Sequence, residues 1–171
     1  MDRRAVGTGL YAGLLFTALG LVAWASGEPF IFPSLGPSAY VLAFRRRFAD
    51  TQRTVIGAHA IGGAAGLLAY TLFGHGATVT AAAPPLSPMG LRLAASGVAS
   101  VVLTSWGMMA TDTNHPPACA TTLIVSLGLL PEPRQVAVIL VAVVVLVEVH
   151  RAVLLAFRSL VGATHPVYQD A

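Results

Sequence analysis

The sequence predicts an all-α protein that crosses a membrane several times and is built as two inverted halves. Composition is the first reason, because 56% of the residues are hydrophobic and only 10% are charged, whereas an average soluble domain is about 25% charged. The second reason is that four apolar stretches are each long enough to cross a bilayer as a helix. The third is that two shorter apolar segments are interrupted by prolines at matching places, as in transporters with inverted repeats.

The first apolar stretch, Ala5 to Ala25, is longer than the roughly 7–15 apolar residues of a secretory signal peptide. We therefore expect it to be a retained membrane span, although Ala23-Trp24-Ala25 resembles a cleavage site. The other three expected spans are Thr54 to Phe73, Met89 to Ala110 and Gln135 to Phe157. Gly62 and Gly66 in the second span are four residues apart, a spacing that lets another helix approach closely.

The two interrupted segments are Phe30 to Phe44 and Thr111 to Thr122. In the first, Pro33, Gly36 and Pro37 are expected to prevent helix through the first half, which leaves two helical turns from Ser38. In the second, Pro116 and Pro117 supply no backbone N–H, but proline is well suited to a first helical position. We therefore expect extended backbone followed by a short helix from Ala118.

The arginines indicate whether these segments cross the membrane or re-enter it. With six passes, eight of the ten arginines share one side and only Arg92 and Arg134 face the other. With four passes and two re-entrant segments, they divide five against five. The positive-inside rule favours six passes in the cell membrane with both termini cytoplasmic, although four spans plus two re-entrant segments remain the alternative. The single transmembrane domain would then contain a weak internal repeat of about 5–73 and 89–158, with the halves inverted.

The interrupted segments also predict a binding site. A helix N-terminus carries unpaired N–H groups and partial positive charge, so two such termini that face each other would bind an anion. His59 lies on the face of the second span that carries Gly62 and Gly66, and ionisable residues inside spans are functional candidates by default. Helix capping is an equally good interpretation of Ser34, Ser38 and Thr122. The candidate substrate-binding residues are Ser34, Gly36, Ser38, His59, Asn114, His115, Pro116, Pro117, Ala118, Thr121 and Thr122.

Other kinds of site find little support in the sequence. Its histidines lack the spacing and carboxylate of a zinc site, so we expect no metal and no other cofactor. Ser105, His115 and Asp112 have no spacing typical of a hydrolase, and we expect no enzyme activity. The ten arginines are scattered, without the basic run of a nucleic-acid-binding protein. Glu148 and Arg151, three residues apart, are expected to form a local ion pair.

Three blocks of residues, in order, resemble the HPP family of small integral membrane proteins. They are Phe32 to Ala39, Gln52 to His59, and His115 to Thr121, which begins with the His115-Pro116-Pro117 motif that gives the family its name. The resemblance extends from the first span to the last. Thr54, Ala58 and Cys119 stand where the family usually has Asn, Gly and Gly, and Cys119 would narrow the site.

The resemblance implies nitrite transport, which is associated with plastid and cyanobacterial members, and it implies the four spans by which the family is commonly described. With the anion site expected from the residues, it favours transport of nitrite or a similar small monovalent anion. A membrane scaffold or ligand sensor without transport is the alternative. The expected partners are a small inorganic anion, the lipid bilayer, protons if transport is coupled to them, and other copies of the chain, because small-residue faces need shielding.

Overall fold

The protein is described by a computed structural model that covers residues 3–45 and 51–161. Within those residues there are helices and loops and no strand, which confirms the predicted all-α class. Four of the described helices are long and apolar enough to cross a membrane. The elements are α1 (Arg3–Ser26), α2 (Ile31–Arg45), α3 (Thr51–Ala69), η1 (Tyr70–Gly74), η2 (Val79–Ala81), α4 (Pro88–Thr111), α5 (Ala118–Ser126) and α6 (Pro133–Val161).

Helix α2 is longer than the sequence predicted. It is helical from Ile31 to Arg45 with Pro37 inside it, so the expected break before Ser38 is wrong. Pro33 lies in the first turn, where no N–H is needed, so Pro37 alone removes an internal hydrogen bond. Packing on α1 compensates, because Phe16 of α1 contacts the rings of Phe32 and Tyr40, with centroids 6.4 and 5.7 Å apart.

The second interrupted segment has the predicted form. Asp112 ends α4 in the left-handed conformation at φ 53°, and its N–H bonds to the carbonyls of Met108 and Met109. Backbone without helical structure then leads to α5, which begins at Ala118 directly after the two prolines. Gly128, with φ 76°, turns the chain after α5 toward α6.

Contacts along α3 show that this segment traverses the bundle. At the start of α3, Arg53 Nη2 donates to the carbonyl of Thr111 at 3.3 Å. At the far end of η1, which directly follows α3, a Cβ placed on Gly74 would lie 3.3 Å from the carbonyl oxygen of Ser126. The chain from residue 111 to residue 126 therefore runs beside α3 from one end of the bundle to the other.

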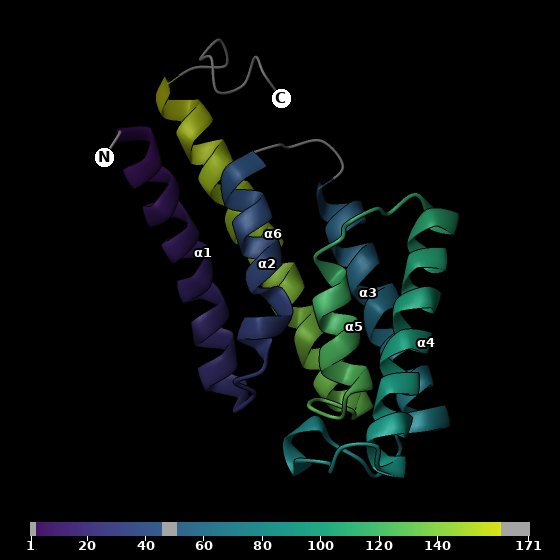
Figure 1. Cartoon of the computed structure of the whole chain (residues 1–171). Helices are drawn as coiled ribbons and strands as arrows, with labels where there is room; N and C mark the ends of the chain where they lie inside the picture. The colour runs from purple at the N-terminus through teal and green to yellow at the C-terminus, as the bar shows by residue number, and fades with distance from the viewer. Residues whose placement is uncertain (1–2, 46–50, 162–171) are drawn as a thin grey trace.

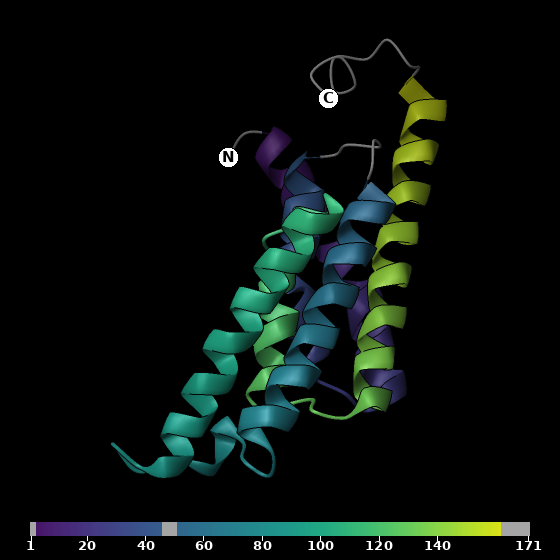
Figure 2. The same cartoon turned by 90° about the vertical axis from the view of Figure 1, so that its right-hand side faces the viewer.

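Helix α2 traverses the bundle in the same way beside α1, with Phe32 near Gly20 and Tyr40 against Phe16. Helices α1 to α6 alternate in direction in both views, and α1 begins at the end of the bundle where α6 finishes (Figures 1 and 2). Four candidate spans and two short traverses give six in all. We call the end where α1 begins and α6 finishes the upper end, as in Figure 1, and the opposite end the lower end.

The six traverses form two lobes. Helices α1, α2 and α6 contact one another and form the first lobe, whereas α3, α4 and α5 form the second. The lobes meet where α2 contacts α5 and where α3 contacts α6, and we call this boundary the seam (Figure 1). Each half of the chain thus gives two helices to one lobe and one to the other. The proposed sequence repeat between the halves stays a prediction.

Candidate substrate site between the two lobes

Five polar side chains are buried together at the seam, and we call them the polar cluster. Ser34, Ser38, His59 and Thr121 have no exposed surface, and His115 is 5% exposed. The two serines come from α2 of the first lobe, and the other three members come from the second lobe. All five are among the residues that the sequence nominated.

The polar cluster is one continuous chain of hydrogen bonds. Ser34 Oγ lies 2.7 Å from Thr121 Oγ1, and Thr121 Oγ1 lies 2.7 Å from His59 Nδ1. The opposite ring nitrogen, His59 Nε2, lies 2.7 Å from Ser38 Oγ, and Ser38 Oγ lies 2.9 Å from His115 Nε2. Hydroxyls and imidazoles alternate around both histidines, and each of these groups can donate as well as accept.

Ser38 is the centre of this arrangement because both histidines reach its one hydroxyl. The two imidazole rings are 5.6 Å apart, centroid to centroid. A hydroxyl has one hydrogen, so in the neutral cluster Ser38 donates to one imidazole and accepts from the other. The two histidines therefore hold complementary roles, and the tautomer of one fixes that of the other.

Helix periodicity explains why these residues meet. Ser34 and Ser38 are four residues apart on α2 and lie on the face toward the second lobe. Gly36 lies on another face, where an added Cβ would be 3.2 Å from Phe16 of α1. Close approach of α3 and α5 brings His59 to Thr121, since a Cβ on Gly62 would lie 3.0 Å from the carbonyl oxygen of Ala118. The close packing predicted from Gly62 is confirmed.

The sequence predicted that unpaired backbone N–H groups at the start of α5 would bind the anion, and the structure shows that these groups are already bonded. The N–H groups of Ala118, Cys119 and Ala120 bond to the carbonyls of residues 115, 116 and 117, at 2.9, 3.1 and 3.0 Å. These N–H groups are therefore occupied by the turn that the two prolines form. Ser38 lies in the middle of α2, so it is not at a helix N-terminus either. The site consists of side chains and does not have two facing helix ends.

The remaining nominated residues lie outside the polar cluster. Asn114 and Pro116 are exposed, and Pro117 is half-buried at the start of α5. Thr122 is buried but faces α4, where its Oγ1 lies 2.8 Å from Thr104 Oγ1. Thr121 and Thr122 thus serve different interfaces, because consecutive residues of a helix are about 100° apart.

Sequence reasoning missed this second polar contact between α4 and α5. Ser96 Oγ donates to the carbonyl of Ser126 at 2.7 Å, and Ser100 Oγ donates to Ser126 Oγ at 3.0 Å. Ser96, Ser100 and Thr104 are spaced by four residues, which is the periodicity of one helix face and the signal that could have found them.

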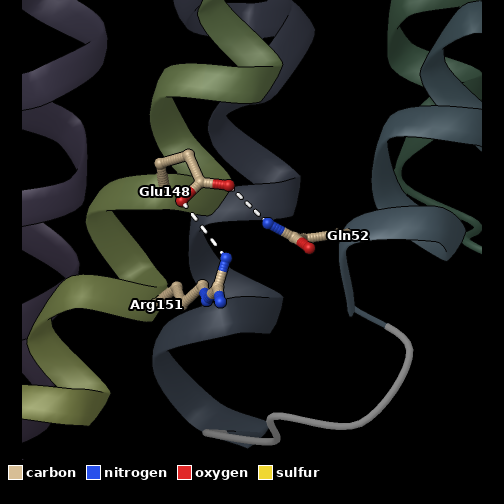
Figure 3. A network of polar contacts seen from close by, with 3 residues as sticks. All are labelled: Gln52, Glu148 and Arg151. Atoms are coloured by element: carbon tan, nitrogen blue, oxygen red, sulfur yellow. Dashed lines mark hydrogen bonds and ion pairs between the residues drawn. The ribbon is translucent and has the colours of Figure 1, made fainter.

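Charged side chains lie at the rim of the seam. At its upper end, Glu148 of α6 accepts a hydrogen bond from Gln52 of α3 and pairs with Arg151, with Nη1 and Oε2 3.8 Å apart (Figure 3). The predicted pair of Glu148 and Arg151 is confirmed, and it is half-exposed. The four hydrogen bonds that join the members of the polar cluster to one another connect hydroxyls with imidazoles or with other hydroxyls.

Two hollows lie elsewhere, on the first lobe. One of about 330 Å³ is lined by α1 and α2, including Phe16 and Tyr40. The other, of about 680 Å³, is an apolar groove between α1 and α6. No member of the polar cluster lines either hollow.

The comparisons with known proteins identify the family of the chain. No curated protein and no solved structure matches the chain. The family described as "HPP, transmembrane region" matches residues 3–165, which is nearly the whole chain and includes every member of the polar cluster. The protein therefore belongs to the HPP family of multi-pass membrane proteins.

Proposed function

We propose that the protein carries nitrite or a similar small monovalent anion across the membrane, through a site at the polar cluster. The observation that carries the proposal is the burial of Ser38 between His59 and His115 at the boundary of two lobes. Polar groups inside a membrane protein are costly and mark substrate pathways. Transporters with inverted halves bind their substrates in this position, near the middle of the bundle where the moving parts meet.

The chemistry of the polar cluster favours an anion over a cation. Three hydroxyls and two imidazoles, joined by four hydrogen bonds, offer O–H and N–H donors to a negative ion. Sites for metal cations instead use several oxygen ligands, commonly carboxylates. A small anion also suits side chains that already lie within hydrogen-bond distance of one another.

The positions of the arginines support one orientation of the protein in the membrane. Arg53 and Arg151 lie at the upper end of the bundle, whereas Arg92 donates to the carbonyls of Phe73 and His75 at the lower end and Arg134 begins α6 there. By the positive-inside rule the upper end faces the cytoplasm, with the protein in the cell membrane.

The test is nitrite uptake into proteoliposomes, with nitrate, formate and chloride as competitors. We expect saturable uptake that falls at least about tenfold in His115→Ala, because the change removes an imidazole from Ser38 and leaves a buried hydroxyl with one partner fewer. His75→Ala is the matched control, since His75 is exposed in the lower loop and its carbonyl bond to Arg92 is made by backbone. His75→Ala should transport at the wild-type rate.

Uptake of none of these anions by folded protein would overturn the proposal. Saturable nitrite binding without uptake would instead identify a ligand sensor. Equal loss of uptake in His75→Ala and His115→Ala would mean that the polar cluster is not the substrate site.

A further inference from the structure

We propose that the apolar groove between α1 and α6 binds one phospholipid whose headgroup carries a phosphate and a primary ammonium group, a phosphatidylethanolamine. One acyl chain lies along the groove, the phosphate binds Arg134, and the ammonium group lies beside Glu28. This lipid site is separate from the polar cluster and does not depend on the transported substrate. It follows from the walls and the width of the groove, from the position of Arg134 and from the charges at the lower end of the bundle.

The walls of the groove are apolar on both sides. Residues of α1 and α6 that form them include Leu21, Val22, Ala25, Val138, Val141 and Val145. Ser26 and Arg134 are its two polar members, and the Ser26 hydroxyl donates to the carbonyl of Val22 at 2.7 Å. Arg134 is therefore the polar group that the groove offers to a ligand.

The dimensions of the groove favour a hydrocarbon chain over a helix of a second copy. Its lining on α6 runs from Arg134 to Val149, which is about 22 Å of helix. A volume of about 680 Å³ over this length gives a mean cross-section of about 30 Å². A helix with its side chains is about 10–12 Å across, so its cross-section is at least about 80 Å². A single acyl chain is far thinner than a helix and would contact both walls along its length.

Arg134 lies at the depth of the lipid headgroups. It is the second residue of α6 and so stands at the lower end of the candidate span Pro133–Leu160. At the same end, Trp24 is 84% exposed and lies two residues before the end of α1. Tryptophan is enriched where a membrane meets water. The groove therefore runs from the phosphate region at Arg134 into the hydrocarbon interior.

The guanidinium of Arg134 is available to a ligand. It is exposed, and within residues 3–45 and 51–161 its side chain forms no hydrogen bond and no ion pair. The other arginine of the lower end, Arg92, instead donates to the carbonyls of Phe73 and His75. A planar guanidinium can donate two parallel N–H groups to a phosphate, which gives both strength and orientation.

Carboxylates near Arg134 select the headgroup. Glu28 follows α1 at the lower end, and its carboxylate accepts a hydrogen bond from Nε2 of Gln135, the neighbour of Arg134, at 3.3 Å. In the described part of the chain, Glu28 and Arg134 form no ion pair with each other. Exposed Glu132 adds a second carboxylate just before α6. An anionic lipid would meet these carboxylates as well as the guanidinium, whereas phosphatidylethanolamine offers each charge its opposite.

The test is native mass spectrometry of the whole chain in a non-ionic detergent. Phosphatidylethanolamine, phosphatidylglycerol and phosphatidylcholine with the same acyl chains are added in equal amounts, so that bound lipids are distinguished by mass. We expect one phosphatidylethanolamine for each chain and at least about tenfold weaker binding of the other two. Phosphatidylglycerol has no cation for Glu28, and the quaternary ammonium of phosphatidylcholine has no N–H donor.

Two pairs of variants test where the lipid binds. Arg134→Ala should weaken binding of phosphatidylethanolamine at least about tenfold, because a charged hydrogen bond to the phosphate is lost. Arg158→Ala is the matched control, since Arg158 is exposed in the last turn of the same helix, at the upper end. Val141→Trp should displace the lipid by filling the groove, whereas Val144→Trp should not, because Val144 is exposed on α6 outside the groove.

Glu28→Gln tests the choice of headgroup, because it removes the charge and keeps an oxygen that accepts from Gln135. It should abolish the preference for phosphatidylethanolamine over phosphatidylglycerol. Equal binding of the three lipids by the wild-type protein would overturn the assigned headgroup. Equal binding by Arg134→Ala and Arg158→Ala would overturn the site itself. A lipid-free dimer that dissociates in Val141→Trp would show that a second copy occupies the groove and would also overturn the inference.

Discussion

At the scale of single residues, the structure separates neighbours that the sequence treats alike. Thr121 joins the polar cluster through His59 and Ser34, whereas Thr122 bonds to Thr104 of α4. Both are threonines within a small, apolar stretch, so composition cannot tell which one faces the seam. That choice depends on the rotation of α5, which is set by its packing against α3.

Thr121→Val should destabilise the protein, because it replaces a shared hydroxyl by a methyl group of similar size. His59 Nδ1 and Ser34 Oγ would both lose a buried partner, and each such loss costs about 1–3 kcal/mol. The measurement is thermal unfolding of the purified protein in detergent. Thr17→Val is the control, since the Thr17 hydroxyl bonds only to the carbonyl of Gly13 on an exposed face of α1. An unchanged midpoint for Thr121→Val would contradict the hydrogen-bond chain.

At the scale of helices, glycines in α3 position the histidines. A Cβ on Gly66 would lie 2.8 Å from Val125 Cβ and 2.9 Å from the carbonyl oxygen of Thr122. Both are closer than real Cβ contacts allow, and the second neighbour is backbone that cannot rotate away. The spacing of Gly62 and Gly66 therefore sets the distance between α3 and α5, and through it the bonds of His59.

Gly66→Ala should separate α3 from α5 and weaken both stability and transport. Overpacking of this kind costs about 1–3 kcal/mol, and the longer His59–Thr121 distance should lower nitrite uptake. Gly13→Ala provides the comparison, because no atom lies within 4 Å of a Cβ placed there. Unfolding and uptake assays on the two variants should differ. Equal behaviour would mean that the close approach of α3 and α5 is unimportant.

An element could be predicted from the sequence where its cause lies within a few residues of it. The start of α5 follows from Pro116 and Pro117, because missing N–H groups act within one turn. The continuity of α2 through Pro37 could not be predicted in this way. The helix continues where the ring of Phe16 in α1, a residue distant in the sequence, packs on Phe32 and Tyr40, and no local signal reports such a contact.

At the scale of the whole molecule, the six traverses determine at which end of the bundle each connecting loop lies. Leu86 and Glu132 are exposed at the lower end, and Asn114 is exposed at the upper end. If the segment from 112 to 126 re-entered the membrane instead, Asn114 and Glu132 would share a side. The arginine distribution predicts six membrane crossings because it reports on whole loops, whereas it contains no information on which helices form each lobe.

Single cysteines at these three positions distinguish the arrangements. Cys119 is first replaced by alanine, so that each variant carries one thiol. In intact cells, a membrane-impermeant maleimide should label Leu86→Cys and Glu132→Cys, whereas Asn114→Cys should react only after permeabilisation. Labelling of all three in intact cells, or of Leu86→Cys alone, would contradict six traverses with the upper end in the cytoplasm.

The division into two lobes has a mechanical consequence for the polar cluster. The bond between His59 and Thr121 lies within the second lobe, whereas the bonds of Ser34 and Ser38 cross the seam. A motion of one lobe relative to the other would therefore leave His59 bonded to Thr121 and would move the serine hydroxyls of α2 away from both histidines. Tilting toward either end would open the seam to one aqueous compartment at a time. The three hydrogen bonds across the seam would then form only in the position in which the seam is closed to both compartments.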